Sequence, residues 1–277
     1  MKQKIKVAIQ GKLGSFHNIV ANRYFEDDTS LVLCDSFDQT VKELLEENAD
    51  VAVMAIENSI AGSIIPNYAL IDQNNLKIVG EYELNINHNL MGLDGQSIKE
   101  IDEVFSHPMA LLQCKSFFQN YPHIRLVESE DTAEEAHLIS KDKLKKRGAI
   151  ASKEAANIYN LTIYASSIQT IKNNITRFFI IQKKDSFVNE KKINKASLKF
   201  ILDHQRGSLA AVLNVMSDCQ LNLTKIQSLP VIETPGKYAF FVDVTFDDFS
   251  YYNKARKLIE IMASKFKILG EYSKYQR

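Results

Sequence analysis

Short apolar runs alternate with segments of helical period over roughly the first 165 residues of the chain. Runs rich in Val, Ile, Leu and Ala, bounded by polar residues, are typical of buried strands. The runs expected to be strands are Ile5–Ile9, Leu31–Leu33, Val51–Ile56, Leu76–Val79, Glu103–Phe105, Ile124–Val127 and Ala149–Ala151.

Segments with an apolar residue every three or four positions lie between these runs and predict helices. Ser36 and Thr132 each stand directly before such an apolar face, so both are expected to cap a helix N-terminus. Strands that alternate with helices in this way predict a parallel α/β architecture. The expected helices are Ser15–Phe25, Ser36–Glu47, Pro108–Asn120 and Thr132–Lys141.

The pattern changes after a polar, Lys-rich stretch from Gln182 to Lys195, which we interpret as a linker. Beyond it the expected order is strand, helix, strand, strand, helix, strand, which is the ferredoxin-like unit. Pro235 and Gly236 supply a turn between the two central strands. These elements are expected at Ser197–Leu202, Ser208–Cys219, Leu223–Val231, Tyr238–Phe246, Tyr251–Ser264 and Phe266–Tyr272.

Composition narrows the class of protein. The chain has 277 residues, 45% of them hydrophobic, and its 34 basic and 34 acidic residues give no net charge. A neutral chain lacks the electrostatic footprint of a protein that binds nucleic acid or an anionic membrane. We therefore expect small molecules or further copies of the chain as partners, with no nucleic acid and no membrane.

The N-terminal stretch Met1–Gln10 has basic residues but no long apolar core and no small-residue cleavage site, so it is interpreted as a first strand and not as a signal peptide. No uncharged apolar run approaches the roughly 20 residues that cross a bilayer. The three cysteines, Cys34, Cys114 and Cys219, are widely separated, which argues against a disulfide framework or a zinc site. A reducing cytoplasm is the expected location.

Three polar clusters stand where expected strands end, and we expect them to converge on one cleft. Glu57, Asn58 and Ser59 follow one strand, Ser106-His107-Pro108 opens a helix that contains Gln113, and Asn174-Ile-Thr-Arg-Phe178 runs into an apolar stretch. Each cluster also has a simpler interpretation, since Asn and Ser in loops bond their own backbone.

A nucleophilic Ser–His or Cys–His pair is a further alternative at the second cluster, but adjacency in sequence does not establish hydrogen-bond geometry. No Gly-x-Ser-x-Gly elbow is present. We expect Cys114 to be a packing residue and His107 a positioning group. The other histidines show no paired spacing that would hold a metal, so no metal site is expected; they are His17, His88, His123, His137 and His204.

Two helix starts are candidate anion sites. Gly11-Lys-Leu-Gly-Ser15 links a strand to a helix whose first N–H groups could receive an anion, or it is an ordinary turn. Thr132-Ala-Glu-Glu-Ala136 combines helix capping with N–H groups suited to a substrate carboxylate.

The three clusters, in this order, resemble the prephenate dehydratase family, whose patterns are Glu-Asn-Ser, Ser-His-Pro…Gln and Asn-x-Thr-Arg-Phe. The family also carries Gly-Pro-x-Gly-Thr, where this chain has Lys12 and Ser15, and usually a Pro where this chain has Ala55. The resemblance covers nearly the whole chain. It implies an α/β, two-lobed catalytic domain like the periplasmic binding proteins over residues 1–185, and a ferredoxin-like (βαββαβ) ACT regulatory domain over residues 196–277.

The resemblance implies decarboxylative dehydration of prephenate to phenylpyruvate, with no cofactor. Thr176 would donate a hydrogen bond to the departing hydroxyl, and Arg177 would either clamp a carboxylate or face a structural acid. The catalytic residues implied are Thr176, Glu57, Asn58, Ser106 and Gln113, and the substrate-binding residues are Ser15, Ser59, His107, Thr132, Asn174, Arg177 and Phe178.

The C-terminal part is similar to the phenylalanine site of ACT-bearing dehydratases. The family's Gly-Ala-Leu becomes Gly207-Ser208-Leu209, and its Glu-Ser-Arg-Pro becomes Gln227-Ser228-Leu229-Pro230, which removes both charges. Phenylalanine is therefore the implied feedback effector, unless the module serves dimerisation alone. The allosteric residues implied are Gly207, Ser208, Leu209, Asn222, Leu223, Gln227 and Ser228.

The family resemblance further implies a homodimer or homotetramer. Few residues precede Ile5 or follow Tyr272, so no chorismate mutase segment is expected. Two other functions stay open. One is arogenate dehydratase, whose substrate has an amino group in place of the keto group. The other is a non-catalytic solute-binding or sensor protein with the same two lobes.

Overall fold

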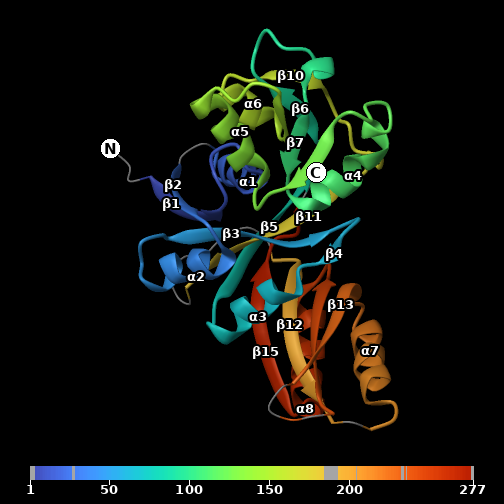
Figure 1. Ribbon diagram of the computed structural model, residues 1–277. Helices are drawn as coiled ribbons and strands as arrows, with labels where there is room; N and C mark the ends of the chain where they lie inside the picture. Colours follow the sequence, from blue (N-terminus) through green and yellow to red (C-terminus); the bar gives the residue numbers. More distant parts are fainter. Residues whose placement is uncertain are drawn as a thin grey trace. The chain divides into compact units, whose positions relative to one another are not determined.

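The computed structural model describes residues 4–26, 29–183, 193–203, 205–231, 234 and 236–275. The chain forms two compact units (Figure 1), one of Met1–Asn67 and Tyr82–Phe178 and the other of Tyr68–Glu81 and Phe179–Arg277. It passes from one unit to the other within α3 (Ile65–Gln73), β5 (Lys77–Asn85) and β11 (Ile175–Gln182).

The first unit contains a sheet in which β1 lies between β2 and β3 and pairs with both in parallel. The short strand β4 pairs with the end of β3, and β11 lies on the far side of β3 from β1. Ser36 caps α2 by accepting a hydrogen bond from Gln39 N, as the sequence predicts. The elements are β1 (Ile5–Gln10), α1 (Phe16–Tyr24), β2 (Thr29–Cys34), α2 (Phe37–Leu45), β3 (Val51–Asn58) and β4 (Gly62–Ser63).

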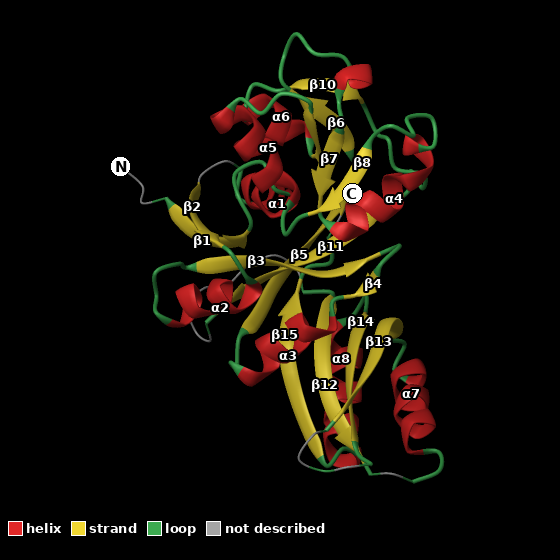
Figure 2. Ribbon diagram, in the orientation of Figure 1, coloured by secondary structure: helices red, strands yellow, loops and turns green. Residues whose placement is uncertain are grey.

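A second sheet in this unit has five strands in the order β10-β6-β9-β7-β8. Figure 2 shows α5 and α6 on one face of it and α4 on the other. Ile150 packs with the α4 cluster, whereas its strand neighbours Ala149 and Ala151 pack with α5 and α6. The elements are β6 (Asn89–Gly92), a 3-10 turn at Ile98–Glu100, β7 (Glu103–Ser106), α4 (Pro108–Phe118), β8 (Arg125–Glu128), α5 (Thr132–Asp142), β9 (Arg147–Ala151), α6 (Lys153–Ile158) and β10 (Thr162–Ala165).

The predicted parallel architecture holds for β7, β8 and β9, whereas the two pairings made by β6, a strand that the sequence did not predict, are antiparallel. The partners of β6 in these two pairings are β9 and β10. The reason is connectivity, since β6 brings the chain in after β5 and β10 leads it back toward β11 without a crossover helix.

The second unit has the predicted βαββαβ order and an all-antiparallel sheet, β13-β14-β12-β15, with β5 beside β15. The order of strands and helices is that of the ferredoxin-like unit. Tyr68, from α3, packs edge-on against Phe241 with ring centroids 5.5 Å apart. The elements are β12 (Lys195–Leu202), α7 (Ser208–Asp218), β13 (Asn222–Pro230), β14 (Tyr238–Thr245), α8 (Phe249–Met262) and β15 (Lys265–Tyr272).

Several predicted boundaries move. The middle of the proposed linker, residues 184–192, lies outside the described residues, as do Pro235 and His204. Lys195 does not belong to a linker, because it starts β12 and its ammonium pairs with the Glu81 carboxylate at 2.7 Å, both side chains being buried. Gly236 has the positive φ of 88° that a turn residue with no Cβ tolerates.

The predicted cap of α5 is also wrong. Asp131, not Thr132, is the N-cap residue, with its carboxylate accepting from Ala133 N and Glu134 N at 2.8 and 2.9 Å. Thr132 is instead the first helical residue. Asp131 has the extended backbone of a cap residue, and both residue types suit that position, so the sequence could not separate them.

Candidate active site

The loop that follows β3 is fastened to the start of β11 by main-chain and side-chain bonds. Ser59 N donates to Ile175 O at 2.8 Å, and Ile175 N donates back to the Ser59 hydroxyl at 3.0 Å. This reciprocal pairing fixes the loop one residue away from Asn58 and the strand one residue away from Thr176. Residues that are 118 positions apart in sequence are thereby held side by side.

The Asn58 side chain begins a network of hydrogen bonds that links these two segments to α4. Its Nδ2 donates to Asn174 Oδ1 at 2.7 Å and to Thr176 Oγ1 at 2.9 Å. Asn174 Nδ2 in turn donates to Gln113 Oε1 at 2.8 Å. The same Gln113 oxygen lies 3.0 Å from Nε2 of His88. The predicted residues Asn58, Gln113, Asn174 and Thr176 therefore meet in one place.

Two main-chain N–H groups set the direction of every bond in this Asn58 network. Ile60 N and Ala61 N donate to Asn58 Oδ1 at 3.0 and 2.9 Å, so that atom must be the amide oxygen and Nδ2 must be the donor. Asn174 therefore accepts from Asn58 through its oxygen and donates to Gln113 through its NH₂ group. The Gln113 atom that accepts this hydrogen bond must be its side-chain oxygen.

This direction leaves two donors unused. The Thr176 oxygen accepts from Asn58, and within the described residues its hydroxyl hydrogen has no acceptor. The Gln113 oxygen accepts from Asn174, and its amide NH₂ group likewise has no acceptor among the residues described. Thr176 is 8% exposed, so its hydrogen is held in a largely water-free place. The arrangement can therefore offer two hydrogen bonds to the oxygen atoms of a bound molecule.

Of the two roles foreseen for Arg177, the structure favours the one that faces an acid. Its Nε lies 3.6 Å from the Glu57 carboxylate, and the arginine is nearly buried while Glu57 is about one-third exposed. Neighbouring residues of a strand point to opposite faces, so Arg177 and Thr176 do not serve the same face of β11. Phe178 is buried and packs edge-on against His17, with ring centroids 5.1 Å apart.

The remaining predicted residues have structural partners of their own. Ser15 caps α1, and His107 caps α4 by accepting from Met109 N at 3.2 Å. Ser106 is fully buried and donates to Ile150 O at 2.7 Å, which ties β7 to β9. Among the residues described, no hydrogen bond joins Ser15, Ser106, His107 or Thr132 to the Asn58 network.

Asp131 is a further residue of this region, and no role for it was predicted from the sequence. Its carboxylate lies so close to Gly11 that a Cβ at Gly11 would be 2.7 Å from Oδ2. Burial raises the pKa of Asp131, and burial also lowers the pKa of the neighbouring His107. Because Asp131 already occupies two N–H groups of α5, the expected carboxylate site at Thr132 has fewer donors to offer.

Burial affects the ionisation of two histidines and of Cys114. Within the described residues no group of three or more potential metal ligands occurs, and burial lowers the pKa of both His17 and His88 to about 4. Cys114 is completely buried, and that burial raises its pKa to about 12. Its predicted role in packing is confirmed. No helix in the described part of the chain has the length and apolarity needed to cross a membrane.

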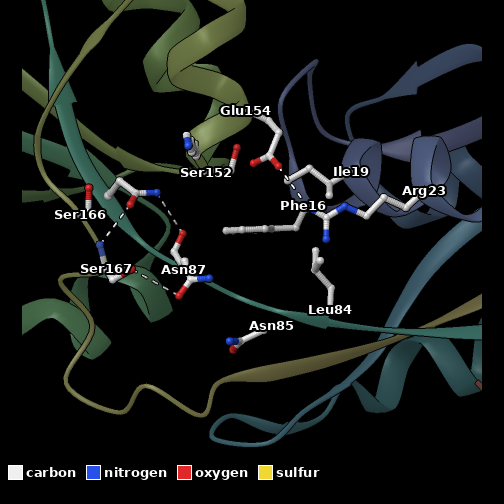
Figure 3. Close-up of a pocket in the computed structure, with 12 residues that line it drawn as sticks. Phe16, Ile19, Arg23, Leu84, Asn85, Asn87, Ser152, Glu154, Ser166 and Ser167 are labelled. Carbon is white, nitrogen blue, oxygen red and sulfur yellow. Dashed lines mark hydrogen bonds and ion pairs between the residues drawn. The ribbon is translucent and has the colours of Figure 1, made fainter. Parts of the chain in front are cut away.

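A separate pocket of about 470 Å³ lies beside α1 in the first unit. Figure 3 shows the Phe16 ring reaching into it and the Arg23 guanidinium beside Glu154, to which it is paired at 3.3 Å. Leu84, Asn87 and Ser152 also line it. Phe16 packs edge-on against His88 at 5.8 Å, so this pocket adjoins the Asn58 network without containing its donors.

In the second unit, the candidate effector residues fall on α7 and β13. Gly207 is the N-cap of α7 with φ 83°, and Ser208 donates to Gln205 O. Gly207 and Asn222 lie on either side of α7 in the sequence, a helix of 11 residues and so roughly 16 Å in length. Leu209 and Leu223 are partly buried against the core, whereas Gln227 donates to Ser228 O on the strand surface.

Sequence comparisons give a consistent family. A family model described as prephenate dehydratase matches residues 7–186. A Methanocaldococcus jannaschii protein named prephenate dehydratase is 35% identical over 258 residues, which is 90% of each chain. An Arabidopsis thaliana protein named arogenate dehydratase/prephenate dehydratase 2, chloroplastic, is 34% identical over 97% of this chain and 73% of its own length.

Solved structures share the α/β fold with its two sheets. The prephenate dehydratase of Arthrobacter aurescens, in complex with L-Phe, has a TM-score of 0.87 with 22% identity, over 97% of this chain and 90% of its own. A structure described as a novel type of quorum-quenching acylase has a TM-score of 0.86 with 24% identity, over 98% of both chains. Likeness at such identity shows the fold alone, so the chemistry must be argued from the side chains.

Proposed function

The chain belongs to the prephenate dehydratase family, and from that premise we propose that it converts prephenate to phenylpyruvate in phenylalanine biosynthesis. In this reaction the bond between the ring and its carboxylate breaks, and the electron pair completes an aromatic ring as the opposite C–O bond breaks. Carbon dioxide and hydroxide leave together. Aromatisation drives the reaction, so the protein must hold the substrate and help a poor leaving group to depart.

The observation that carries the proposal is the hydrogen bond that the Thr176 oxygen accepts. Asn58 donates to this oxygen, which turns the hydrogen outward as a donor for the departing hydroxyl group. Such a hydrogen bond strengthens as negative charge grows on the leaving oxygen, and it therefore stabilises the transition state more than the bound substrate. Threonine is too weak an acid to surrender its proton freely, so Thr176 acts as a hydrogen-bond donor.

Other residues take supporting roles in this proposal. The Gln113 NH₂ group is the second unused donor and binds a substrate oxygen. Arg177 holds Glu57 in position, and Ser59 and Asn174 fix the loop and the strand that carry Asn58 and Thr176. Ser15 and His107 cap helices, Ser106 ties β7 to β9, Thr132 begins α5 and Phe178 packs against His17, and in this proposal they support the site without donating to substrate.

A pair of substitutions at Thr176 tests this function. Thr176→Ala removes the donor and is expected to lower kcat by roughly 10²- to 10³-fold, the usual cost of losing one hydrogen-bond donor to charge that develops in the transition state. Thr176→Ser keeps a hydroxyl at the same place and is expected to retain most of the activity. Both variants are assayed by the ultraviolet absorbance of phenylpyruvate after a melting curve has shown them to be folded. A folded Thr176→Ala protein with the wild-type kcat would rule out the assignment.

The same assay separates the rival functions. An arogenate dehydratase would turn over arogenate faster than prephenate, and a solute-binding or sensor protein would bind a ligand without releasing phenylpyruvate. The Asn58 network favours catalysis, because it keeps donors directed outward from a largely buried position.

We further propose that residues 1–185 form the catalytic domain and residues 196–277 an ACT regulatory domain that binds phenylalanine. The βαββαβ order supports the second assignment, as does the L-Phe complex of the Arthrobacter aurescens relative. Calorimetry with phenylalanine, together with inhibition of turnover, tests it. Inhibition requires that phenylalanine bind one conformational state more tightly than the other. If phenylalanine produces no heat of binding and does not inhibit turnover, dimerisation would be the remaining role of this domain.

We place the enzyme in the cytoplasm as a homodimer or homotetramer. The three cysteines are buried free thiols, which suits a reducing compartment. Sedimentation velocity would distinguish the two assemblies, and a monomer at micromolar concentration would contradict both.

A further inference from the structure

His88 is a buried residue to which the proposed mechanism gives no task. It lies between β5 and β6, is 4% exposed, and packs edge-on against Phe16. Its Nε2 is 3.0 Å from Gln113 Oε1, while Nδ1 is buried and has no hydrogen-bond partner in the part of the chain described. A buried polar atom without a partner is uncommon, and among the described residues the hydrogen bond that holds this ring is made at Nε2.

The direction of the Asn58 network decides which nitrogen of His88 carries the hydrogen. The atom that Gln113 presents to Asn174 must be oxygen, because Asn174 donates to it. An oxygen already receiving one hydrogen bond can accept another but cannot donate. His88 must therefore donate from Nε2, and the neutral ring keeps a lone pair on Nδ1. Burial keeps the ring neutral by lowering its pKa to about 4.

We propose that His88 is a positioning residue for the dehydration, acting through Gln113. Two donors, His88 Nε2 and Asn174 Nδ2, converge on the single oxygen of Gln113. Together they fix the rotation of that amide, so that its NH₂ group is presented away from the network toward substrate. This inference rests on the proposed function, since the role of His88 is to aim a donor that the function uses.

The alternative is that His88 merely fills space beside Phe16. The two roles of His88 differ in which substitutions at this position would preserve activity. A space-filling residue is replaced well by any apolar side chain of similar size. A positioning donor is replaced only by a side chain that presents an N–H group where Nε2 stands, and the amide nitrogen of glutamine can do so.

The first test compares His88→Leu with His88→Gln in the full chain. The leucine variant is expected to lose roughly tenfold in kcat, the effect of one lost hydrogen bond, with little change in KM. The glutamine variant is expected to restore kcat to about the wild-type value. Equal kcat in the wild type and the leucine variant would overturn the proposal, and so would equal losses in both variants. Melting curves identify any variant that fails to fold.

The second test is made on the wild-type protein, and the His88→Gln variant serves only to assign the His88 signal. Nitrogen-15 NMR of the imidazole rings reports which nitrogen of each neutral histidine bears the hydrogen. His17 serves as an internal reference, because its Nε2 accepts from Ala55 N at 3.3 Å and its hydrogen must therefore be on Nδ1. His88 is expected to show the opposite tautomer, its signal being assigned by its loss in His88→Gln.

A His88 ring with its hydrogen on Nδ1 would refute the proposal even if the enzyme is active. If instead the wild-type protein releases no phenylpyruvate from prephenate, the proposed function fails. The tautomer would then still show whether the network runs in the stated direction. The two failures are thus distinguishable.

Discussion

Asn58→Asp is the substitution that most directly tests the direction of the Asn58 network. The two side chains have the same shape, and aspartate can still accept from Ile60 N and Ala61 N. Its second oxygen, however, takes the place of the NH₂ group and faces Asn174 Oδ1 at 2.7 Å and Thr176 Oγ1 at 2.9 Å. Two oxygens at such distances need a hydrogen between them. The Thr176 hydroxyl must therefore turn toward Asp at position 58, and the Asn174 amide must rotate.

The expected loss of kcat in Asn58→Asp follows from the hydrogen bond between the Thr176 hydroxyl and the new carboxylate, which must break before Thr176 can bind the substrate. A hydrogen bond from a hydroxyl to a charged carboxylate is worth about 1.5–3 kcal/mol. Thr176 must give it up before it can donate to the departing oxygen, and each 1.36 kcal/mol added to the barrier costs about tenfold in rate. Reorientation alone thus predicts a loss of roughly 10- to 150-fold in kcat. The added negative charge also repels a doubly anionic substrate, so KM is expected to rise.

The assay is phenylpyruvate formation from prephenate at saturating substrate, with Asn120→Asp as the control. Asn120 is exposed at the end of α4, so that variant adds the same charge to the same unit away from the network. Since rotation of Asn174 turns Gln113 as well, His88 in Asn58→Asp is expected to move its hydrogen from Nε2 to Nδ1. A folded Asn58→Asp enzyme with a kcat within about threefold of wild type would refute the reasoning.

Three further outcomes are expected. Gly270→Ala should lower the free energy of unfolding by about 1–3 kcal/mol in urea titrations, because its Cβ would lie 2.2 Å from the main-chain oxygen of Ile78. Since the folded pKa of His17 and His88 is about 4, below the unfolded value near 6.5, stability should fall as pH drops from about 6.5 to 4, by about 3 kcal/mol for each ring. Melting curves across that pH range check this, and His88→Gln should lessen the slope. Ser106→Ala should leave a main-chain carbonyl of β9 without its donor and cost about 1–3 kcal/mol of stability in the same titrations; a kcat loss in a variant of unchanged stability would instead favour a catalytic Ser106.

The sequence predicted which residues meet because short polar side chains at strand ends are easily recognised. Asn58 comes from the end of a strand, Gln113 from the helix that the second cluster opens, and Asn174 and Thr176 from the start of β11; their side chains join in one network. What the pattern could not predict is the direction of the bonds. The two ends of an amide look alike in a sequence, and only the main-chain N–H groups of the folded loop distinguish them.

For other residues of the same clusters, the residue type does not tell whether the side chain binds a ligand or has a structural role. A serine or histidine before a helix caps it as readily as it binds a ligand, and the structure shows capping for Ser15 and His107. Ser106 donates to a carbonyl 44 residues later in the chain, a partner that no local pattern reveals. The helix α3 was missed because it lacks the polar face that marks a surface helix: Tyr68 and Ile71 are buried within it.

The Asn58 network ends at the main-chain N–H groups of Ile60 and Ala61 on one side and at His88 on the other, and only one of these ends determines which atoms donate its hydrogen bonds. A histidine can donate or accept at Nε2, according to its tautomer, so His88 adapts to either direction and cannot choose between them. Main-chain N–H groups can only donate, so Ile60 and Ala61 make the choice. The conformation of the loop after β3 thus determines whether the Thr176 hydrogen points outward. Ser59 fastens that loop to β11, so under the proposed function it acts on the reaction through Asn58 and Thr176.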